Sequence, residues 1–137
     1  MIILDTNVLG ELVRPQPDRN VVRWVDSRAA GEFATTAITA AEMALGAAQM
    51  EDGKRKAQII ALNAAILEQM ATILPFSAGD AAHYARVMDS RRRLGRRIEP
   101  LDAQIAAIAL SQRAIVATRN LKDFEETGVD VIDPWTA

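Results

Sequence analysis

MIILDTN (Met1–Asn7) opens the chain and is the most informative stretch for its fold class. Ile2–Leu4 is too apolar for a surface edge and predicts a short buried strand. Asp5 ends this strand, and Thr6 or Asn7 can cap the helix that follows. A buried strand that leads directly into a helix is typical of α/β proteins.

The same alternation of short apolar strands and helices continues along the chain. We predict strands at 33–36, 73–76, 115–117 and 129–132, and helices at about 6–13, 19–28, 39–45, 52–72, 78–94 and 101–113, with a helical turn from Asn120. This order predicts an α/β layer structure with a mostly parallel central sheet. Neither a repeat nor a linker divides the sequence, so residues 1–137 are expected to form a single domain.

Composition excludes several classes of chemistry. The chain has 16 Lys and Arg against 18 Asp and Glu, so any contact with nucleic acid must come from a local basic patch. The absence of cysteine excludes disulfides, thiolate zinc sites and cysteine nucleophiles. His83 is the single histidine, which excludes a ribonuclease that uses two histidines as acid and base. No targeting signal or membrane span is visible, so we expect a cytoplasmic protein without membrane contact.

Acidic residues recur where the predicted strands end or helices begin. Because parallel sheets bind ligands beyond the carboxyl ends of their strands, these side chains are expected to meet in one crevice. They are Asp5, Glu42, Asp102 and Asp123, with Asn120 beside the last of them.

Each of these residues also has a purely structural interpretation. Thr39-Ala-Ala-Glu42 matches a helix capping box. Asp102 can favour a helix N-terminus through its charge, Asn120 with Asp123 can cap a helix, and Asp5 can be a turn residue. Sequence alone leaves both interpretations open.

A folded protein keeps a cluster of carboxylates when a cation neutralises their charge or when some of them hold protons. At 4 Å and an effective dielectric constant near 20, each like-charged pair costs on the order of 4 kcal/mol. With oxygen ligands only, the neutralising cation is hard, Mg²⁺ or Mn²⁺. Such ions activate water and stabilise attack on a phosphodiester.

Four blocks of the sequence, in order and spacing, resemble the PIN-domain family, and most closely its VapC-type toxins of the FitB-like branch. The blocks are MIILDTNVL (residues 1–9), TAAE (39–42), LDAQIAAIA (101–109) and ATRNLKDF (117–124). The resemblance implies a three-layer α/β/α fold and a Mg²⁺- or Mn²⁺-dependent endoribonuclease. It also implies a homodimer and a cognate VapB- or FitA-like antitoxin that neutralises the toxin.

The resemblance also assigns site residues. Asp5, Glu42 and Asp102 align with the acidic trio of the family, and Asp5 and Asp102 are expected to bind the metal directly. Asn120 occupies a position that is commonly aspartate, which leaves open whether Asp123 completes the metal site and the catalytic set. Residues expected to orient these groups are Thr6, Thr118 and Asn120.

An arginine-rich segment precedes Asp102 and is a candidate RNA-binding rim, since guanidinium groups pair well with phosphates. Its candidate RNA-binding residues are Arg91, Arg92, Arg93, Arg96 and Arg97. A solvated helix end and a surface for an acidic antitoxin are alternatives. Trp24 and Phe33 are expected in a core or an interface, and His83 is expected to be structural.

Two other functions remain as alternatives. One is an aspartyl-phosphate enzyme, but the haloacid-dehalogenase pattern requires a second aspartate where Asn7 stands. A PIN-like module that binds RNA or a partner without catalysis is the other alternative, which the departure at Asn120 leaves open.

Overall fold

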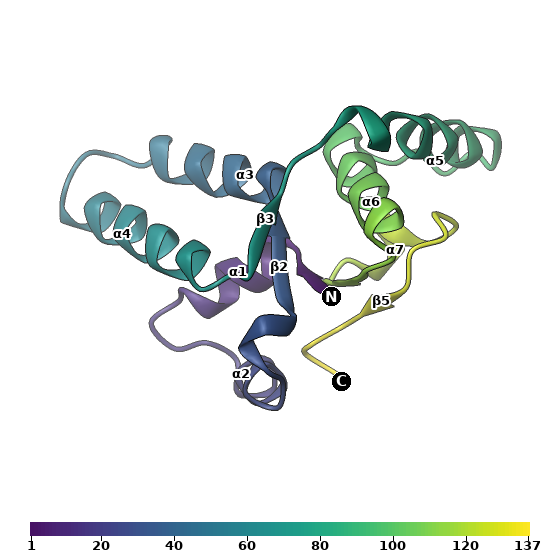
Figure 1. Cartoon of the computed structure of the whole chain (residues 1–137). Helices are drawn as coiled ribbons and strands as arrows, with labels where there is room; N and C mark the ends of the chain where they lie inside the picture. Colours follow the sequence, from purple (N-terminus) through teal and green to yellow (C-terminus); the bar gives the residue numbers. More distant parts are fainter.

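A central sheet of five parallel strands organises the computed structural model, which describes residues 1–137 (Figure 1). The strand order is β3-β2-β1-β4-β5, so the N-terminal strand lies in the middle of the sheet. The strands are β1 (Ile2–Leu4), β2 (Phe33–Thr36), β3 (Thr72–Leu74), β4 (Ile115–Ala117) and β5 (Val131–Ile132). The parallel pairing confirms the predicted fold class.

The sheet separates two hydrophobic cores, because successive side chains of a strand point to opposite faces. Ile3 of β1 pairs in register with Ala34 and Val116, and all three contribute to one core. Ile2 and Leu4, on the same strand, contribute to the other core. Both faces of β1 are therefore covered, which explains why its sequence is continuously apolar.

Helices cover both faces and give the three-layer α/β/α architecture (Figure 1). The first core is closed by α5 (Ala81–Arg93), α6 (Pro100–Gln112) and α7 (Leu121–Phe124). The second is closed by α1 (Thr6–Leu12), α2 (Arg19–Asp26) and Met43 of α3 (Ala37–Ala48). Short 3₁₀ turns, η1 (Ala30–Glu32) and η2 (Ala78–Asp80), precede β2 and α5. Trp24 and Phe33 lie in the second core with ring centroids 5.8 Å apart, which confirms their predicted burial.

A hairpin of α3 and α4 (Lys54–Glu68) extends to one side of the sheet (Figure 1). No residue of α4 is fully buried, and Ile60 and Leu62 are exposed. Only its C-terminal part, at Ile66 and Leu67, packs against the second core. None of the helices in the structure has the length and apolarity that crossing a bilayer requires.

Several predicted boundaries were wrong, and each has a physical reason. The helix expected to start at Thr39 begins at Ala37, because the side chain of Thr36 accepts a hydrogen bond from the Thr39 amide and caps the helix. β3 ends at Leu74 rather than residue 76, since Pro75 has no amide hydrogen for the strand ladder. α4 and β5 are likewise shorter than predicted.

Candidate functional site

Asp5 lies at the carboxyl end of the central strand and is almost inaccessible, with 4% of its surface exposed. Its backbone amide donates a 3.0 Å hydrogen bond to the carbonyl of Ala117, the last residue of β4. The residues that follow β1 and β4 therefore lie side by side. This is the sheet edge at which the sequence predicted a crevice.

Three donors fix the carboxylate of Asp5. The amide of Thr6 donates to Oδ1 at 2.8 Å, which makes Asp5, rather than Thr6 or Asn7, the N-cap of α1. Oδ2 accepts from the hydroxyl of Thr118 at 2.8 Å and from the side-chain amide of Asn7 at 3.2 Å. Burial raises the pKa of Asp5, the bonds from Thr118 and Thr6 lower it, and the charges of Glu42 and Asp123 raise it further.

Thr118 is fully buried and uses all the hydrogen-bonding capacity of its hydroxyl. Its single proton goes to Asp5, and its oxygen accepts from the Asn7 side chain at 3.1 Å and from the Asn120 amide at 3.0 Å. The carbonyl oxygen of the Asn7 side chain accepts from the amide of Arg119 at 3.0 Å. The network ties the segment after β4 to the segment after β1.

Glu42 lies on α3, in its second turn, because the helix starts at Ala37. The capping-box interpretation of Thr39 and Glu42 was therefore wrong. Instead, Oε1 of Glu42 accepts a 2.8 Å hydrogen bond from the hydroxyl of Thr6, and Thr39 Oγ1 lies 3.2 Å from the same hydroxyl. Thr6 thus connects the Asp5 segment to Glu42.

Asp102 lies in the first turn of α6, behind Pro100 at the first helical position. Desolvation raises its pKa to about 7, with further contributions from the negative charges of Asp5, Asp123 and Glu42. Glu99 contributes least of the five causes. Asp5 and Asp102 therefore lie within electrostatic range of each other and of both Glu42 and Asp123.

Asn120 and Asp123 stand at the start of α7. Asn120 is the N-cap residue by position, but its side chain makes no capping bond, so the capping interpretation of the pair was wrong for Asn120. Its side chain is exposed. Asp123 is half-buried and faces the cluster closely enough to act on Asp5 and Asp102.

The chemistry of this donor set fits a hard divalent cation. Its donor atoms are oxygens throughout, and a cation would offset the burial and the like charges that together raise the pKa of Asp5 and Asp102. In their present rotamers, however, no three His, Cys, Asp or Glu side chains of the chain converge closely enough to hold one metal ion. The donors are gathered at one sheet edge, and completing the coordination would require side-chain rotation.

Arg91 does not belong to an exposed rim, contrary to the sequence-based expectation. It is 5% exposed, and its guanidinium donates to four backbone carbonyls. Two of these belong to Arg96 and Arg97, at 2.6 and 3.4 Å, and two to Asp123 and Glu125, at 3.0 and 2.8 Å. The hydrogen bonds of Arg91 therefore connect α5 to the loop before α6 and to the segment that contains Asp123.

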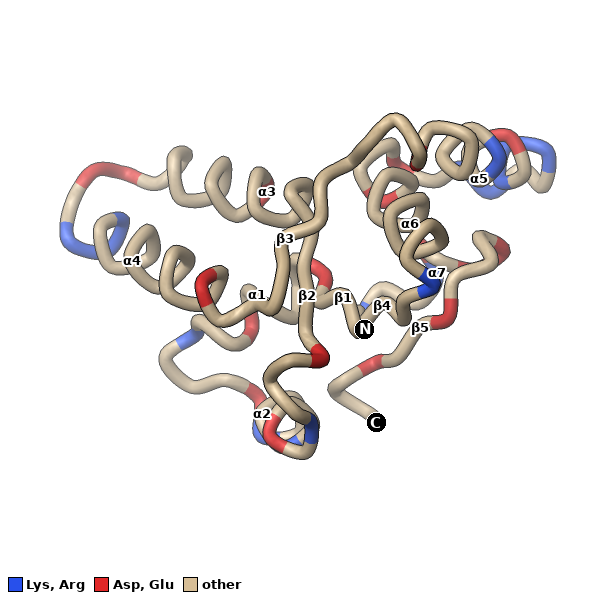
Figure 2. The backbone as a smooth tube through the Cα atoms, viewed as in Figure 1, with Lys and Arg blue, Asp and Glu red and all other residues tan.

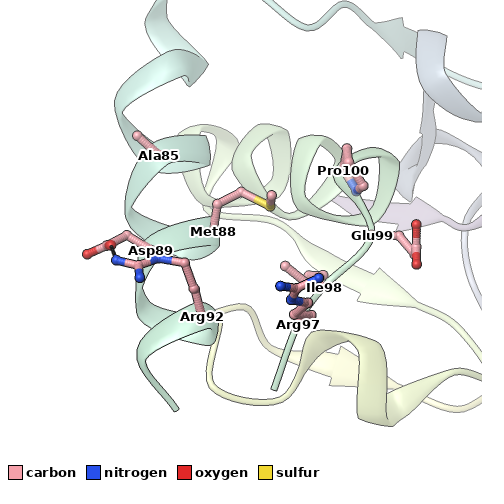
Figure 3. A pocket seen from close by; sticks show the side chains of 8 residues that line it. All are labelled: Ala85, Met88, Asp89, Arg92, Arg97, Ile98, Glu99 and Pro100. Atoms are coloured by element: carbon pink, nitrogen blue, oxygen red, sulfur yellow. Dashed lines mark hydrogen bonds and ion pairs between the residues drawn. The ribbon is translucent and has the colours of Figure 1, made fainter. Parts of the chain in front are cut away.

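The other four arginines of the segment are exposed, and Figure 2 shows basic residues gathered at the end of α5. Arg92 and Arg93 both pair with Asp89, at 2.9 and 2.8 Å, and Arg96 pairs with Glu125. Arg97 forms no ion pair and lines a groove of about 580 Å³ between α5 and the loop before α6 (Figure 3). Other lining residues are Ala85, Met88, Asp89, Arg92, Ile98, Glu99 and Pro100.

Sequence reasoning missed two residues of the site. Asn7 was not predicted to be a site residue, although its amide donates hydrogen bonds to both Asp5 and Thr118. Arg119 was not considered, although its amide is bonded to Asn7. In the sequence Asn7 directly follows Thr6 and Arg119 directly follows Thr118, and this adjacency was the available signal.

Known proteins match this chain over nearly its whole length. The PIN domain family matches residues 2–129. The VapC ribonuclease Y4jK of Sinorhizobium fredii is 39% identical over 137 residues, 98% of each chain. Toxin FitB of Neisseria gonorrhoeae is 41% identical over 137 residues, which cover 98% of this chain and 99% of FitB.

Solved structures agree as well. A chain in the crystal structure of FitAcB from Neisseria gonorrhoeae superimposes with a TM-score of 0.92 at 40% identity, and the match covers 100% of both chains. A chain in the structure of FitAB bound to a DNA fragment gives a TM-score of 0.91 at 41% identity, covering 98% of this chain and 96% of the other.

Proposed function

Because this chain belongs to the PIN-domain family, and within it to the VapC and FitB toxins, we propose that it is a metal-dependent endoribonuclease and the toxin of a toxin–antitoxin pair. The observation that carries the proposal is the position of Asp102 among the carboxylates of Asp5, Glu42 and Asp123 at the carboxyl edge of the sheet. RNA phosphodiesters in the cytoplasm would be its substrate.

Asp5 and Asp102 would hold Mg²⁺ or Mn²⁺ directly. Glu42 and Asp123 would complete the site, either as ligands or through water. When bound, the cation lowers the pKa of an attacking water and stabilises charge on the phosphodiester. The cation preference follows from the oxygen donors.

The residues around the carboxylates would hold them in position. Thr118, Asn7 and the Thr6 amide fix both oxygens of Asp5, so little rotational freedom remains to be lost when it binds a ligand. The hydroxyl of Thr6 holds one oxygen of Glu42 and leaves the other free of side-chain hydrogen bonds. Asn120, which is exposed at the start of α7, would donate a hydrogen bond to substrate.

The groove beside α5 would extend the RNA-binding surface. Arg97 carries an unpaired charge, and Arg92 and Arg93 share the single carboxylate of Asp89, which leaves a net positive charge. Figure 3 shows Glu99 pointing away from Arg92 and Arg97. RNA bound here would lie beside the start of α6, close to Asp102.

The partner would be a VapB- or FitA-like antitoxin, and the active form a homodimer. FitB-like structural relatives are described as FitAB and FitAcB, and further relatives as VapBC complexes from Rickettsia felis and Haemophilus influenzae. Such a partner would have to cover the acidic site or the RNA surface to neutralise the toxin.

The decisive experiment is cleavage of a single-stranded RNA by the purified protein with Mg²⁺ or Mn²⁺ and with EDTA. Asp102→Asn preserves shape but removes a charge from the cluster, so we expect cleavage to fall at least about a hundredfold. Asp52→Asn is the matched control, since Asp52 is exposed in the turn between α3 and α4, pairs only with Lys56 and lies outside the groove. Equal cleavage by wild type and Asp102→Asn would refute the proposed site, and RNA binding without cleavage would favour the inactive-module alternative.

A further inference from the structure

Arg119 carries an exposed positive charge that no carboxylate neutralises. The ion pairs of the structure involve Arg14, Lys56, Arg92, Arg93 and Arg96. The guanidinium of Arg119 instead lies over the ring of Trp135, 4.9 Å from the ring centroid. An arginine over an indole face is held by a cation–π interaction, while the N–H groups at the edge of the guanidinium stay free to donate.

The backbone of Arg119 is fixed beside the acidic cluster. It stands between Thr118, which donates to Asp5, and Asn120. Its amide donates at 3.0 Å to Asn7, whose side chain also holds Asp5. The backbone of Arg119 thus belongs to the same hydrogen-bond network as the buried carboxylate of Asp5.

Trp135 is itself anchored. Its amide donates at 2.9 Å to the carboxylate of Asp133, and its carbonyl accepts at 3.1 Å from the side chain of Asn20, at the start of α2. The half-buried ring therefore forms a fixed platform beyond the end of β5.

We propose that Arg119 binds a backbone phosphate of the RNA next to the scissile bond, with Trp135 holding the guanidinium in place; this inference rests on the proposed ribonuclease function. A cluster of carboxylates repels a polyanion, and a cation positioned at its edge offsets that repulsion. Guanidinium donors match phosphate oxygens in a bidentate geometry. A flexible arginine would lose conformational entropy on binding, whereas one already stacked on an indole loses less.

The test measures binding of a short single-stranded RNA across a range of salt concentrations, in EDTA so that no cleavage occurs. Arg119→Gln should weaken binding by roughly tenfold, the value of one charge-assisted hydrogen bond. It should also reduce the slope of log K against log salt by about 0.7, the contribution of one phosphate contact to a single strand. Trp135→Ala should weaken binding while the slope is retained, and Trp135→Phe should restore most of the affinity, because it keeps an aromatic face.

Arg28→Gln is the matched control. Arg28 also lies over an indole, that of Trp24 at 5.3 Å, but it precedes β2 and so stands at the opposite, amino edge of the sheet. Its variant should bind RNA with wild-type affinity and slope. Equal effects of the two arginine variants would overturn the proposal, as would wild-type binding or an unchanged salt slope in Arg119→Gln.

Cleavage assays separate this inference from the proposed function. In Mg²⁺, Arg119→Gln should raise KM for RNA more than it lowers kcat. RNA cleavage by wild type with an unaltered KM in Arg119→Gln would leave the ribonuclease assignment intact and remove Arg119 from it. Absence of cleavage by wild type, with the expected loss of binding in Arg119→Gln, would retain the phosphate contact and refute the enzyme.

Discussion

The hydroxyl of Thr118 donates a 2.8 Å hydrogen bond to Oδ2 of Asp5, joining residues 113 positions apart in the sequence. Both side chains are buried, and the hydroxyl also accepts from Asn7 and from the Asn120 amide. The Thr118 hydroxyl therefore makes hydrogen bonds both to residues that follow β1 and to a residue that follows β4.

Replacing Thr118 by valine keeps the volume of the side chain but removes its donor and acceptors. We expect the free energy of unfolding to fall by about 1–3 kcal/mol, because buried partners are left unsatisfied. Thr118→Ser keeps the hydroxyl and is the control, and urea denaturation measures both. A valine variant as stable as the serine variant would contradict the network described here.

The raised pKa of Asp102 predicts how the metal-free protein responds to pH. Its pKa is 3.8 in an unperturbed chain and about 7 in the folded protein, so between these values the folded state holds a proton that the unfolded state has lost. Unfolding then releases a proton, and the free energy of unfolding must fall as pH rises from about 5 to about 7.5. The raised pKa of Asp5 acts in the same direction.

Urea titrations in EDTA at several pH values test this slope. Asp102→Asn should flatten it, because the amide does not titrate, and Asp89→Asn should leave it unchanged. A wild-type protein whose stability rises across this pH window would show that Asp102 does not hold the proton in the folded state that its burial and its carboxylate neighbours favour.

Arg91 is predicted to be a structural residue. Arg91→Met keeps much of the side-chain volume but removes hydrogen bonds to four backbone carbonyls, so we expect a loss of roughly 2–3 kcal/mol in the free energy of unfolding. Arg92→Met, at an exposed ion pair on the same helix, should cost less than about 1 kcal/mol. Thermal denaturation compares the two variants. Equal losses of stability in both would contradict the structural role of Arg91.

The contrast between Arg91 and Arg92 shows where sequence reasoning succeeded and where it stopped. The strand at Ile2–Leu4 and the acidic residues near strand ends were predictable, because short apolar runs and the parallel-sheet rule constrain both. The exposure of individual arginines depends on the rotation of α5. Arg91 follows the buried Val87 by four residues, so helical periodicity was an available signal for its burial.

Contacts that depend on distant segments were not predictable. Thr36 and Thr39 are equally good caps by residue type, and only the path of the chain from β2 selects Thr36. The pairing of Arg119 with Trp135 likewise requires β4 and β5 to lie side by side, which brings their following segments together. No local pattern in the sequence contains that information.

Divalent metal ions should stabilise the folded protein, because they offset the repulsion among Asp5, Glu42, Asp102 and Asp123 and bind only when these residues are gathered. At a concentration ten times Kd, Mg²⁺ or Mn²⁺ should add about 1.4 kcal/mol to the free energy of unfolding and raise Tm, and EDTA should reverse the effect. Asp5→Asn and Asp102→Asn should lose this response.

Asp89→Asn should keep the full response to metal, since its neighbours are Arg92 and Arg93 rather than carboxylates. Calorimetric titration of the same variants measures the affinity directly. If wild type shows no change in Tm and no heat of binding at millimolar Mg²⁺ or Mn²⁺, the carboxylates at this sheet edge do not form a metal site, and their gathering would need a different explanation.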